Sequence, residues 1–482
     1  MEFSVINTAI KDIDCDVAIV YLYQNQSLNT ELKQLDEESG GIISDFAIKK
    51  DKFEGKFADS YVLQTYGKIA PSKLLLVGLG EKESLDTTKM RELGAKIIKK
   101  CEKTFKPNTI CAQAPECDLL QAFTEGILLG NYKFEKYKSK KSHLINSFIF
   151  SQTNSALISS NEESVKKAKI IAQTTNYARD LINESPMIIT PGYLADLGTN
   201  FKDIEATIIE GYDALKMGMG AFYSVGMGSD QEPKFIHLKY SPKNATKKIA
   251  LIGKGVTFDS GGLDLKPASS MRNMKDDMSG AAAVLAIMRN LHKLNLPVEV
   301  HGIVAAVENM PSGHAYHPGD ILTAMNGKTI EVDNTDAEGR LTLADALCYA
   351  SKLGVDEIID VATLTGACVV ALGQEVAAIL GDKDLTQNLK NTADKAGERL
   401  WEMPIYKEHL ETLKSDIADL KNTGGRFAGT MAAAAFLREF VTNAKWAHID
   451  IAGVAFTDKE IRGIDKGATG AMVRTLLYYL GA

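Results

Sequence analysis

Short runs of apolar residues alternate along this chain with longer segments in which apolar residues recur every three or four positions. The first pattern predicts buried strands, and the second predicts helices packed on one side. In the first 160 residues, the runs 15–23 and 73–80 predict strands, and 87–105 predicts a helix. This part of the chain is therefore expected to form a smaller α/β domain.

A long helix is predicted next, over residues 161–186. Ser160 or Asn161 can cap it, acidic residues fill its first turn, and Pro186 lies just beyond its end. No Gly/Ser-rich linker accompanies it, so we expect a stiff connection between two domains. The predicted organisation is an N-terminal α/β domain over 1–160, a linking helix over 161–186 and a larger domain over 187–482.

The larger domain alternates continuous apolar strands with amphipathic helices. Strands are predicted at 247–256, 298–308, 356–365 and 446–453, and helices at 277–294, 338–353 and 429–442. This order predicts a mixed, largely parallel sheet covered by helices on both faces. In such sheets ligands bind at the carboxyl ends of the strands.

Composition narrows the class of protein. The chain has 482 residues, 45% hydrophobic and 24% charged, which fits a soluble globular protein of two or three domains. Its net charge of -7 provides no broad basic field for nucleic acid. No apolar run is long enough for a bilayer, and the N-terminus lacks a secretory pattern. The six scattered cysteines are expected to be reduced thiols, so we expect a cytoplasmic protein without membrane contact.

The stretch "NTDAEGRL" (334–341) places Asp336, Glu338 and Arg340 at alternate positions. The preceding residues 328–334 alternate like a strand, so these side chains are expected on one face of an extended segment. Two neighbouring carboxylates repel each other unless a proton or a cation lies between them. The stretch therefore predicts a positively charged partner.

More charged residues follow the predicted strands of the larger domain. Lys254 and Asp259 are expected at the end of one strand, Lys266 follows, and Asp276 and Asp277 begin a helix. We expect a cluster at three strand ends of one sheet, made of Lys254, Asp259, Asp277, Asp336 and Glu338. Such hard oxygen donors suit Mn²⁺, Mg²⁺ or Zn²⁺, and two cations sharing carboxylates would relieve the repulsion.

Each residue also has a simpler structural interpretation. The two acids at 276 and 277 favour a helix N-terminus, and Lys254 can be an ordinary ion-paired lysine. Asp259 can shape a turn, and Arg340 can pair with the acids beside it. The histidines offer no competing metal site, because the sequence has no HExxH. His314 and His317 are expected in a surface loop, and His237, His301 and His448 in the core.

Together these motifs resemble the cytosol (leucyl) aminopeptidases, which are two-metal exopeptidases. "NTDAEGRL" is that family's specific signature, and the resemblance covers most of residues 165–482. The other matching segments are "GKGVTFDSGGLDLKP", "MKDDMSGAAAV", "ENMPSG", "HPGD", "DVATLTGA", "NTGGRFAGT" and "WAHIDIAG". The N-terminal part matches more weakly, chiefly through "YKFEKYK" (132–138).

The resemblance implies a role for each matching residue. One metal would be held by Lys254, Asp259, Asp277 and Glu338, and the other by Asp259, Asp336, with its backbone carbonyl, and Glu338. Lys266 and Arg340 match catalytic positions that bind no metal, and Arg340 would hold a bicarbonate. A hydroxide bridging two Mn²⁺ or Zn²⁺ ions would hydrolyse peptides in a homohexamer. Asp276 matches no ligand position.

The pocket for the substrate's first side chain is implied in the same way. The matching positions are Met274, Thr363, Leu364 and Gly366, which predicts release of leucine and other apolar residues. Two residues depart from the family pattern. His317 replaces a usual arginine away from the ligands, and Ala455 replaces a bulkier methionine in the pocket, which affects side-chain preference rather than chemistry.

Two other functions compete with this interpretation. A two-metal phosphoesterase also uses carboxylates with Lys and Arg, but "GKGVT" and "MGMGAFYSVGMG" (217–228) lack the pattern of a phosphate-binding loop. An accessory DNA-binding role rests only on the five lysines of "YKFEKYKSKKSH" (132–143). That segment is more typical of a solvated helix end, and the overall acidity argues against nucleic acid.

Overall fold

The computed structural model describes residues 1–482, except for the side chain of Cys117. The chain forms two compact units, which are described separately. The N-terminal unit comprises Met1–Gln173 with Glu460–Asp465, and the C-terminal unit comprises Thr174–Lys459 with Lys466–Ala482. Helix α4 (Ile158–Asn183) runs from one into the other. The domain boundaries predicted at 160 and 186 remain predictions.

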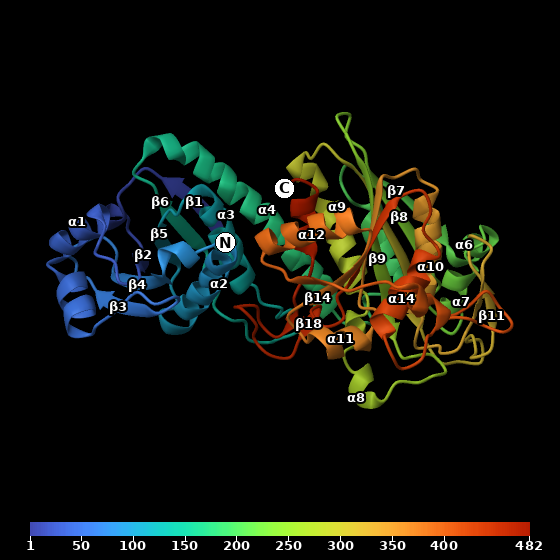
Figure 1. Ribbon diagram of the computed structural model, residues 1–482. Helices are drawn as coiled ribbons and strands as arrows, with labels where there is room; N and C mark the ends of the chain where they lie inside the picture. Colours follow the sequence, from blue (N-terminus) through green and yellow to red (C-terminus); the bar gives the residue numbers. More distant parts are fainter. The chain divides into compact units, whose positions relative to one another are not determined.

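The N-terminal unit is built on a six-stranded sheet in the order β1-β6-β5-β2-β4-β3 (Figure 1). All neighbours pair in parallel except the edge strand β3, which is antiparallel to β4. The strands are β1 (Glu2–Ile6), β2 (Val17–Tyr23), β3 (Ser60–Gln64), β4 (Lys73–Gly80), β5 (Thr109–Gln113) and β6 (Ser147–Ser151). The predicted smaller α/β domain is confirmed.

Both faces of this sheet are covered, because the strand residues alternate between two apolar cores. One core packs under the helices α2 and α3, and the other under α1 and a π-helical segment. The helical elements are α1 (Thr30–Ser39), the π-helix (Ile42–Lys50), α2 (Thr87–Thr104) and α3 (Cys117–Gly130), with 3-10 turns at Ile10–Asp12, Lys82–Ser84 and Ser155–Leu157. Five cysteines are free and buried among the described side chains, which do not include that of Cys117.

The segment Glu460–Asp465 joins the N-terminal unit although it lies near the end of the chain. The carboxylate of Asp465 accepts hydrogen bonds from Lys99 at 2.5 Å and from Lys133 at 3.1 Å. Lys133 also lies 3.3 Å from Glu102. This segment therefore contributes an acid to a mixed charge cluster on α2 and the residues after α3.

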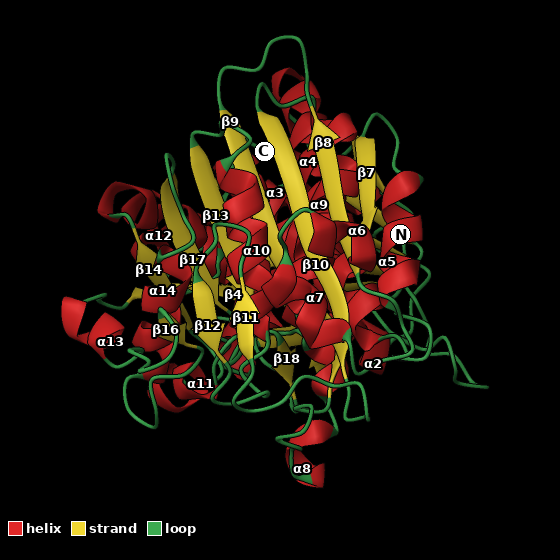
Figure 2. Cartoon of the chain, turned by 90° about the vertical axis from the view of Figure 1, so that its right-hand side faces the viewer, coloured by secondary structure: helices red, strands yellow, loops and turns green.

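The C-terminal unit contains an eight-stranded sheet in the order β15-β14-β17-β13-β9-β10-β8-β7 (Figure 2). The central strands β17, β13, β9 and β10 are parallel, whereas β7 and β8 are antiparallel additions and β14 runs opposite to β17. The strands are β7 (Glu205–Glu210), β8 (Lys234–Tyr240), β9 (Lys248–Asp259), β10 (Glu299–Asn309), β13 (Glu357–Ala362), β14 (Ala377–Gly381), β15 (Leu400–Glu402) and β17 (Lys445–Asp450). The predicted mixed, largely parallel sheet is confirmed.

Helices cover both faces of the large sheet. Helices α7, α10, α11 and α14 pack on one face, and α5, α9, α12 and α15 contact the other face or the helices on it. The helices of this unit are α5 (Pro191–Thr199), α6 (Gly211–Lys216), α7 (Gly220–Gly226), α8 (Ala268–Met271), α9 (Ser279–Leu294), α10 (Gly339–Ser351), α11 (Gly366–Leu372), α12 (Lys383–Ala396), α13 (Lys407–Glu411), α14 (Gly429–Arg438) and α15 (Val473–Tyr479), with a 3-10 turn at Met274–Asp276. In the part of the chain that the structure describes, no helix combines the length and apolar character that crossing a membrane requires.

Two small sheets complete the unit. Strands β11 (Ile321–Thr323), β12 (Thr329–Glu331) and β16 (Leu420–Lys421) form one, and β18 (Phe456–Thr457) and β19 (Gly467–Ala468) form the other. The strand predicted before "NTDAEGRL" is β12, so it belongs to the small three-stranded sheet and not to the large one.

Two glycines allow the start of α9 to approach β13 and β9 closely and the start of α10 to approach β9 closely. A Cβ on Gly280 would lie 2.0 Å from the carbonyl oxygen of Val361, and a Cβ on Gly339 would lie 2.4 Å from Cε of Lys254. Both distances are far below van der Waals contact, so larger residues would push the helices away. The glycines thus bring the residues just before each helix next to Lys254.

Candidate metal centre

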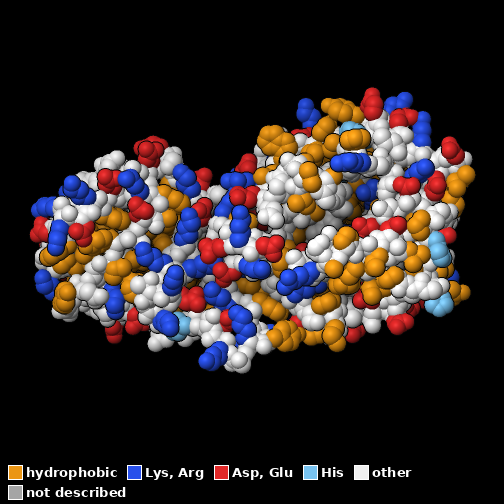
Figure 3. All heavy atoms as spheres, turned by 90° about the horizontal axis from the view of Figure 1, so that it is seen from below, with side chains coloured by type: hydrophobic (Ala, Val, Ile, Leu, Met, Phe, Trp, Pro, Cys, Tyr) orange, Lys and Arg blue, Asp and Glu red, His pale blue; other side chains and the backbone are white. Residues whose placement is uncertain are grey.

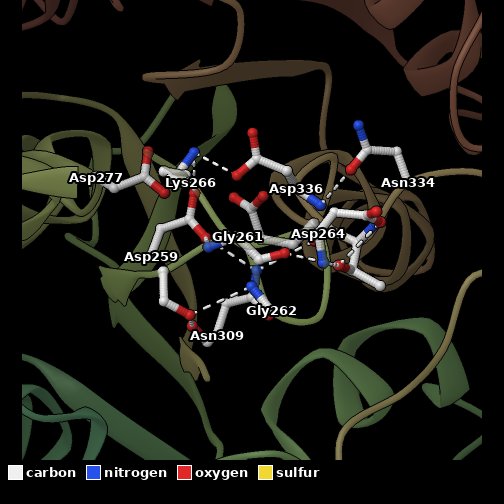
Figure 4. Close-up of polar contacts among 12 residues, drawn as sticks. Asp259, Gly261, Gly262, Asp264, Lys266, Asp277, Asn309, Asn334 and Asp336 are labelled. Carbon is white, nitrogen blue, oxygen red and sulfur yellow. Dashed lines mark hydrogen bonds and ion pairs between the residues drawn. The ribbon is translucent and has the colours of Figure 1, made fainter. Parts of the chain in front are cut away.

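Four carboxylates converge at the end of β9, and they come from three separate segments of the chain. Asp259 is the last residue of β9, Asp277 lies in the turn before α9, and Asp336 and Glu338 lie in the turn before α10. Oxygen atoms of Asp259, Asp336 and Glu338 all lie within 4.8 Å of one another. Figure 4 shows Asp259, Asp277 and Asp336 around Lys266. The predicted cluster therefore forms.

Two details of the prediction are wrong. Residues 335–338 turn instead of extending, and Arg340 already belongs to α10, so Asp336, Glu338 and Arg340 do not share the face of a strand. Among the cluster residues only Asp259 lies at the end of a strand of the large sheet, whereas Lys254 lies within that strand and β12 belongs to another sheet. The acids meet because turns precede both helices, which the alternation of polar and apolar residues does not encode.

Lys254 lies between two of the carboxylates and is only 3% exposed. Its Nζ lies 2.7 Å from Asp277 Oδ1 and 2.8 Å from Glu338 Oε1, and it donates to the carbonyl oxygen of Thr363 at 2.9 Å. Burial lowers the pKa of Lys254, but the adjacent carboxylates outweigh burial and leave the pKa raised. Burial also raises the pKa of Asp277.

Lys266 pairs in the same way with the other two carboxylates. Its Nζ lies 2.8 Å from Asp259 Oδ2 and makes a short ion pair with Asp336 Oδ1. Burial alone would lower the pKa of Lys266, yet these acids raise it. Burial raises the pKa of both Asp259 and Asp336. The two lysines, and not Arg340, are thus the partners that the described ion pairs give to the four acids.

The donor set fits divalent cations. Four carboxylates outnumber the two lysines that pair with them, so the cluster favours additional positive charge. Asp277 Oδ2 is buried and has no hydrogen-bond partner among the described groups. Oxygen-rich sites with one nitrogen donor suit Mn²⁺, Mg²⁺ and Zn²⁺. Asp259, Asp277, Asp336, Glu338 and Lys254 are the residues that could hold such ions.

Arg340 lies beside the cluster and is 8% exposed. Its Nη1 donates to the carbonyl oxygen of Asn422 at 2.6 Å, while its buried Nε has no hydrogen-bond partner among the described groups. Burial lowers the pKa of Arg340 to about 10, so it stays protonated at neutral pH. A protonated N–H without an acceptor is suited to bind a small anion.

The residues expected to line a side-chain pocket occupy two segments, one after β13 and one before α9. Thr363, Leu364 and Gly366 follow β13 and lead into α11, and Met274 begins a 3-10 turn before α9. Thr363 also donates from Oγ1 to Asp277 Oδ1 at 2.8 Å, a contact that the sequence did not indicate. Their role as a pocket remains a prediction.

Comparison with known proteins identifies the family. The family model described as "Cytosol aminopeptidase family, catalytic domain" matches residues 176–477, and that of the N-terminal domain matches residues 19–141. The chain belongs to the cytosol aminopeptidase family. The resemblance drawn from the sequence is therefore confirmed, and the protein is a metallo-aminopeptidase.

The sequences of individual relatives align with most or nearly all of the aminopeptidase chain. It is 45% identical over 442 residues to a probable cytosol aminopeptidase of Aquifex aeolicus, covering 89% of this chain and 88% of the relative. A probable cytosol aminopeptidase of Alkaliphilus oremlandii is 41% identical over 494 residues, with 99% of each chain covered.

Solved structures support the fold of the aminopeptidase. A mutant of tomato leucine aminopeptidase superposes with a TM-score of 0.88 at 34% identity, covering 100% of this chain and 96% of the other. The bottromycin maturation enzyme BotP in complex with Mn gives 0.85 at 31% identity, covering 96% and 98%.

Several residues that hold the ligand-bearing segments of the aminopeptidase were not predicted from the sequence. Asn309 donates to Asp259, and Thr335 exchanges hydrogen bonds with Asp264 through its backbone N–H and its hydroxyl. Asp450 accepts from Leu364 N–H at 3.2 Å. Asn309 could have been singled out by its position, because it directly follows a predicted strand, and that strand pairs with β9.

Four of the five histidines discussed above lie where the sequence predicts, whereas His237 is only half-buried and not fully in the core. His314 and His317 are exposed in the loop between β10 and β11, and His237, His301 and His448 lie in strands. His448 is fully buried, and its Nδ1 lies 2.5 Å from Asp360 Oδ1. Burial lowers the pKa of His448, but Asp360 outweighs burial and raises it.

This pair predicts a pH-dependent contribution to the stability of the aminopeptidase. Because the folded pKa of His448 exceeds its unfolded value of about 6.5, the contribution is complete below that pH and is lost as pH rises through the folded pKa. Asp450 raises this pKa further and Arg340 opposes it. Replacing His448 by leucine should cost about 3–5 kcal/mol at pH 6 and less at pH 8, because the buried Asp360 loses its cationic partner and keeps only the hydrogen bond from Trp446 Nε1.

Denaturant unfolding of the wild type and His448→Leu between about pH 6 and pH 8 measures how this loss of stability depends on pH. His237 provides the control, since burial lowers its pKa to about 4 and it stays neutral throughout. Any deficit of His237→Leu should therefore be flat with pH. A deficit of His448→Leu that is equally flat would contradict the prediction.

Proposed function

We propose that this aminopeptidase holds two divalent cations per subunit, Mn²⁺ or Zn²⁺, and releases leucine and other apolar residues from peptide N-termini. Lys254, Asp259, Asp277 and Glu338 would hold one cation, and Asp259, Asp336 and Glu338 the other, with the backbone carbonyl of Asp336. The observation that carries the proposal is the convergence of four carboxylates with oxygens of three of them within 4.8 Å. Mn in the related BotP structure supports the metal class.

Bound cations would polarise the scissile carbonyl and lower the pKa of a water molecule that attacks it. Lys254 can bind a cation only as the neutral amine, which its burial favours and its carboxylate partners oppose. Asp259 and Glu338 are the acids suited to be shared, since each belongs to both proposed ligand sets. No side chain needs to be acylated.

Two cationic side chains would act on the substrate without binding metal. Lys266, which is 14% exposed in its side chain, can donate to the carbonyl oxygen as negative charge develops on it. Arg340 offers its buried, unpartnered Nε–H to an anion such as bicarbonate, which could pass a proton between water and the leaving amine. Met274, Thr363, Leu364 and Gly366 would receive the first side chain, with the small, buried Ala455 widening the range accepted.

The family resemblance also supports a cytoplasmic homohexamer, which light scattering of the purified protein would test. A nucleic-acid role is not favoured by the lysines after α3. Lys133 is paired with Glu102 and Asp465, and Lys138 with Glu135. Basic and acidic side chains are also interspersed over the face seen in Figure 3. A phosphoesterase finds no support in the family match.

Metal removal tests the proposed function. We expect dialysis against a chelator to remove most activity on leucyl-anilide, and Mn²⁺ or Zn²⁺ to restore it, because the substrate carbonyl then regains its polarising cations. Metal analysis before and after dialysis should follow activity toward two ions per chain. Activity on nitrophenyl phosphate instead of leucyl-anilide would indicate the phosphoesterase, and full activity in verified metal-free protein would refute the two-metal site.

A further inference from the structure

Asn309 ends β10 directly beside the cluster. The pairing of β10 with β9 shifts between Val307 and Asn309, and this shift places Asn309 opposite Asp259. Asn309 is 1% exposed. Figure 4 shows it below Asp259 and the turn of Gly261 and Gly262. A polar side chain buried this deeply at a strand end needs hydrogen-bond partners.

The amide oxygen Oδ1 of Asn309 has no hydrogen-bond partner among the described groups. Both groups that accept from its amide nitrogen belong to segments that carry proposed metal ligands. Its Nδ2 donates to Asp259 Oδ1 at 2.9 Å and to the carbonyl oxygen of Thr335 at 3.1 Å. Thr335 directly precedes Asp336, and Tyr316 donates to the same carbonyl oxygen at 2.7 Å. One NH₂ group therefore connects the end of β9 to the turn before α10.

The two carboxylate oxygens of Asp259 have different partners. Oδ1 accepts from Asn309 and from the N–H of Gly261, each at 2.9 Å. Oδ2 faces Lys266 at 2.8 Å, on the side of Asp336. The two hydrogen bonds to Oδ1 thus fix the orientation of the carboxylate plane, and Oδ2 is the oxygen directed into the cluster.

We propose that Asn309 is a positioning residue that sets metal affinity by fixing the orientation of Asp259 and its separation from the Asp336 turn. The proposal rests on the two-metal function described above. An amide is suited to this task because it offers two N–H groups without charge. A lysine or arginine here would add a competing cation, and a hydroxyl would reach only one of the two acceptors.

Metal titration tests this role. We expect Asn309→Leu, which has the same branching and number of heavy atoms but lacks the donor, to bind Mn²⁺ about 10–100-fold more weakly than wild type by calorimetry. Its activity should reach half-maximum at correspondingly higher Mn²⁺, and Mn²⁺ should raise its melting temperature less. Asn309→Ala should behave alike, and it decides the question if the leucine variant does not fold.

Asn290 provides a matched control. It is also a buried asparagine, at 3% exposure, but it donates to Ala286 within α9. Asn290→Leu should lose stability without any change in Mn²⁺ affinity. If the folded Asn309 variants bind Mn²⁺ within twofold of wild type, the positioning role is overturned. If wild type itself binds no Mn²⁺, the proposed metal site fails instead.

Discussion

Replacing Asp277 by alanine should lower kcat/KM on leucyl-anilide by at least about 10³-fold, which corresponds to about 4 kcal/mol of transition-state stabilisation. The carboxylate lies 2.7 Å from Lys254 and 2.8 Å from Thr363, with its second oxygen free for a cation. Its removal takes away a ligand and leaves Lys254 with one acidic neighbour fewer. Steady-state kinetics with metal analysis on the same preparation measures both losses.

Asp276 is the control for this substitution, since it is adjacent, half-buried and outside the proposed ligand set. Burial raises the pKa of Asp276 to about 7, so alanine removes a carboxyl that is only partly ionised at neutral pH. Asp276→Ala should therefore keep its metals and lose little activity. The reverse order of effects would mean that the ligand is the other acid of "MKDDM".

Replacing Lys266 by alanine should lower kcat by about 10²- to 10³-fold while two metals remain bound, because one donor to the developing oxyanion is lost. The contact of Lys266 with Asp259 and Asp336 makes a purely structural role the competing explanation. A structural role would lower metal content and melting temperature together with turnover. Metal content, melting temperature and kcat of one preparation separate the two.

Arg340→Ala provides the comparison for Lys266. We expect a smaller loss of kcat, since bulk bicarbonate or water can relay protons in its place. Its hydrogen bond to the Asn422 carbonyl oxygen also braces two segments, so some loss of melting temperature is expected. An Arg340→Ala protein with unchanged metals, stability and turnover would exclude both a catalytic and a bracing role.

Much of the fold was predictable because the strands of the large sheet are apolar on both sides. The runs 298–308 and 356–365 correspond to β10 and β13, and the helices between them have a clear apolar face. Sheet membership was not predictable in the same way. The alternation in 328–334 marks a strand, but local pattern does not say which sheet β12 joins, because pairing partners lie far away in sequence.

The site shows the same division. The acids and lysines were predicted from their residue types and the family motif, since charges so close together require opposite charges. The turn at 335–338 was missed because a period of two was extended across a helix start. Asn309 was missed because its importance arises from a register shift between two strands, which single-sequence patterns do not reveal.

The discontinuity of the N-terminal unit limits how this enzyme can be recombined. Residues 1–173 alone would leave behind Asp465, the acid that Lys99 and Lys133 share. A chimera that exchanges only the first third of the chain would therefore pair the homologue's residues at positions 99 and 133 with the original Asp465. A chimera that exchanges the N-terminal unit should therefore also exchange Glu460–Asp465, so that both parts of the unit come from the same homologue.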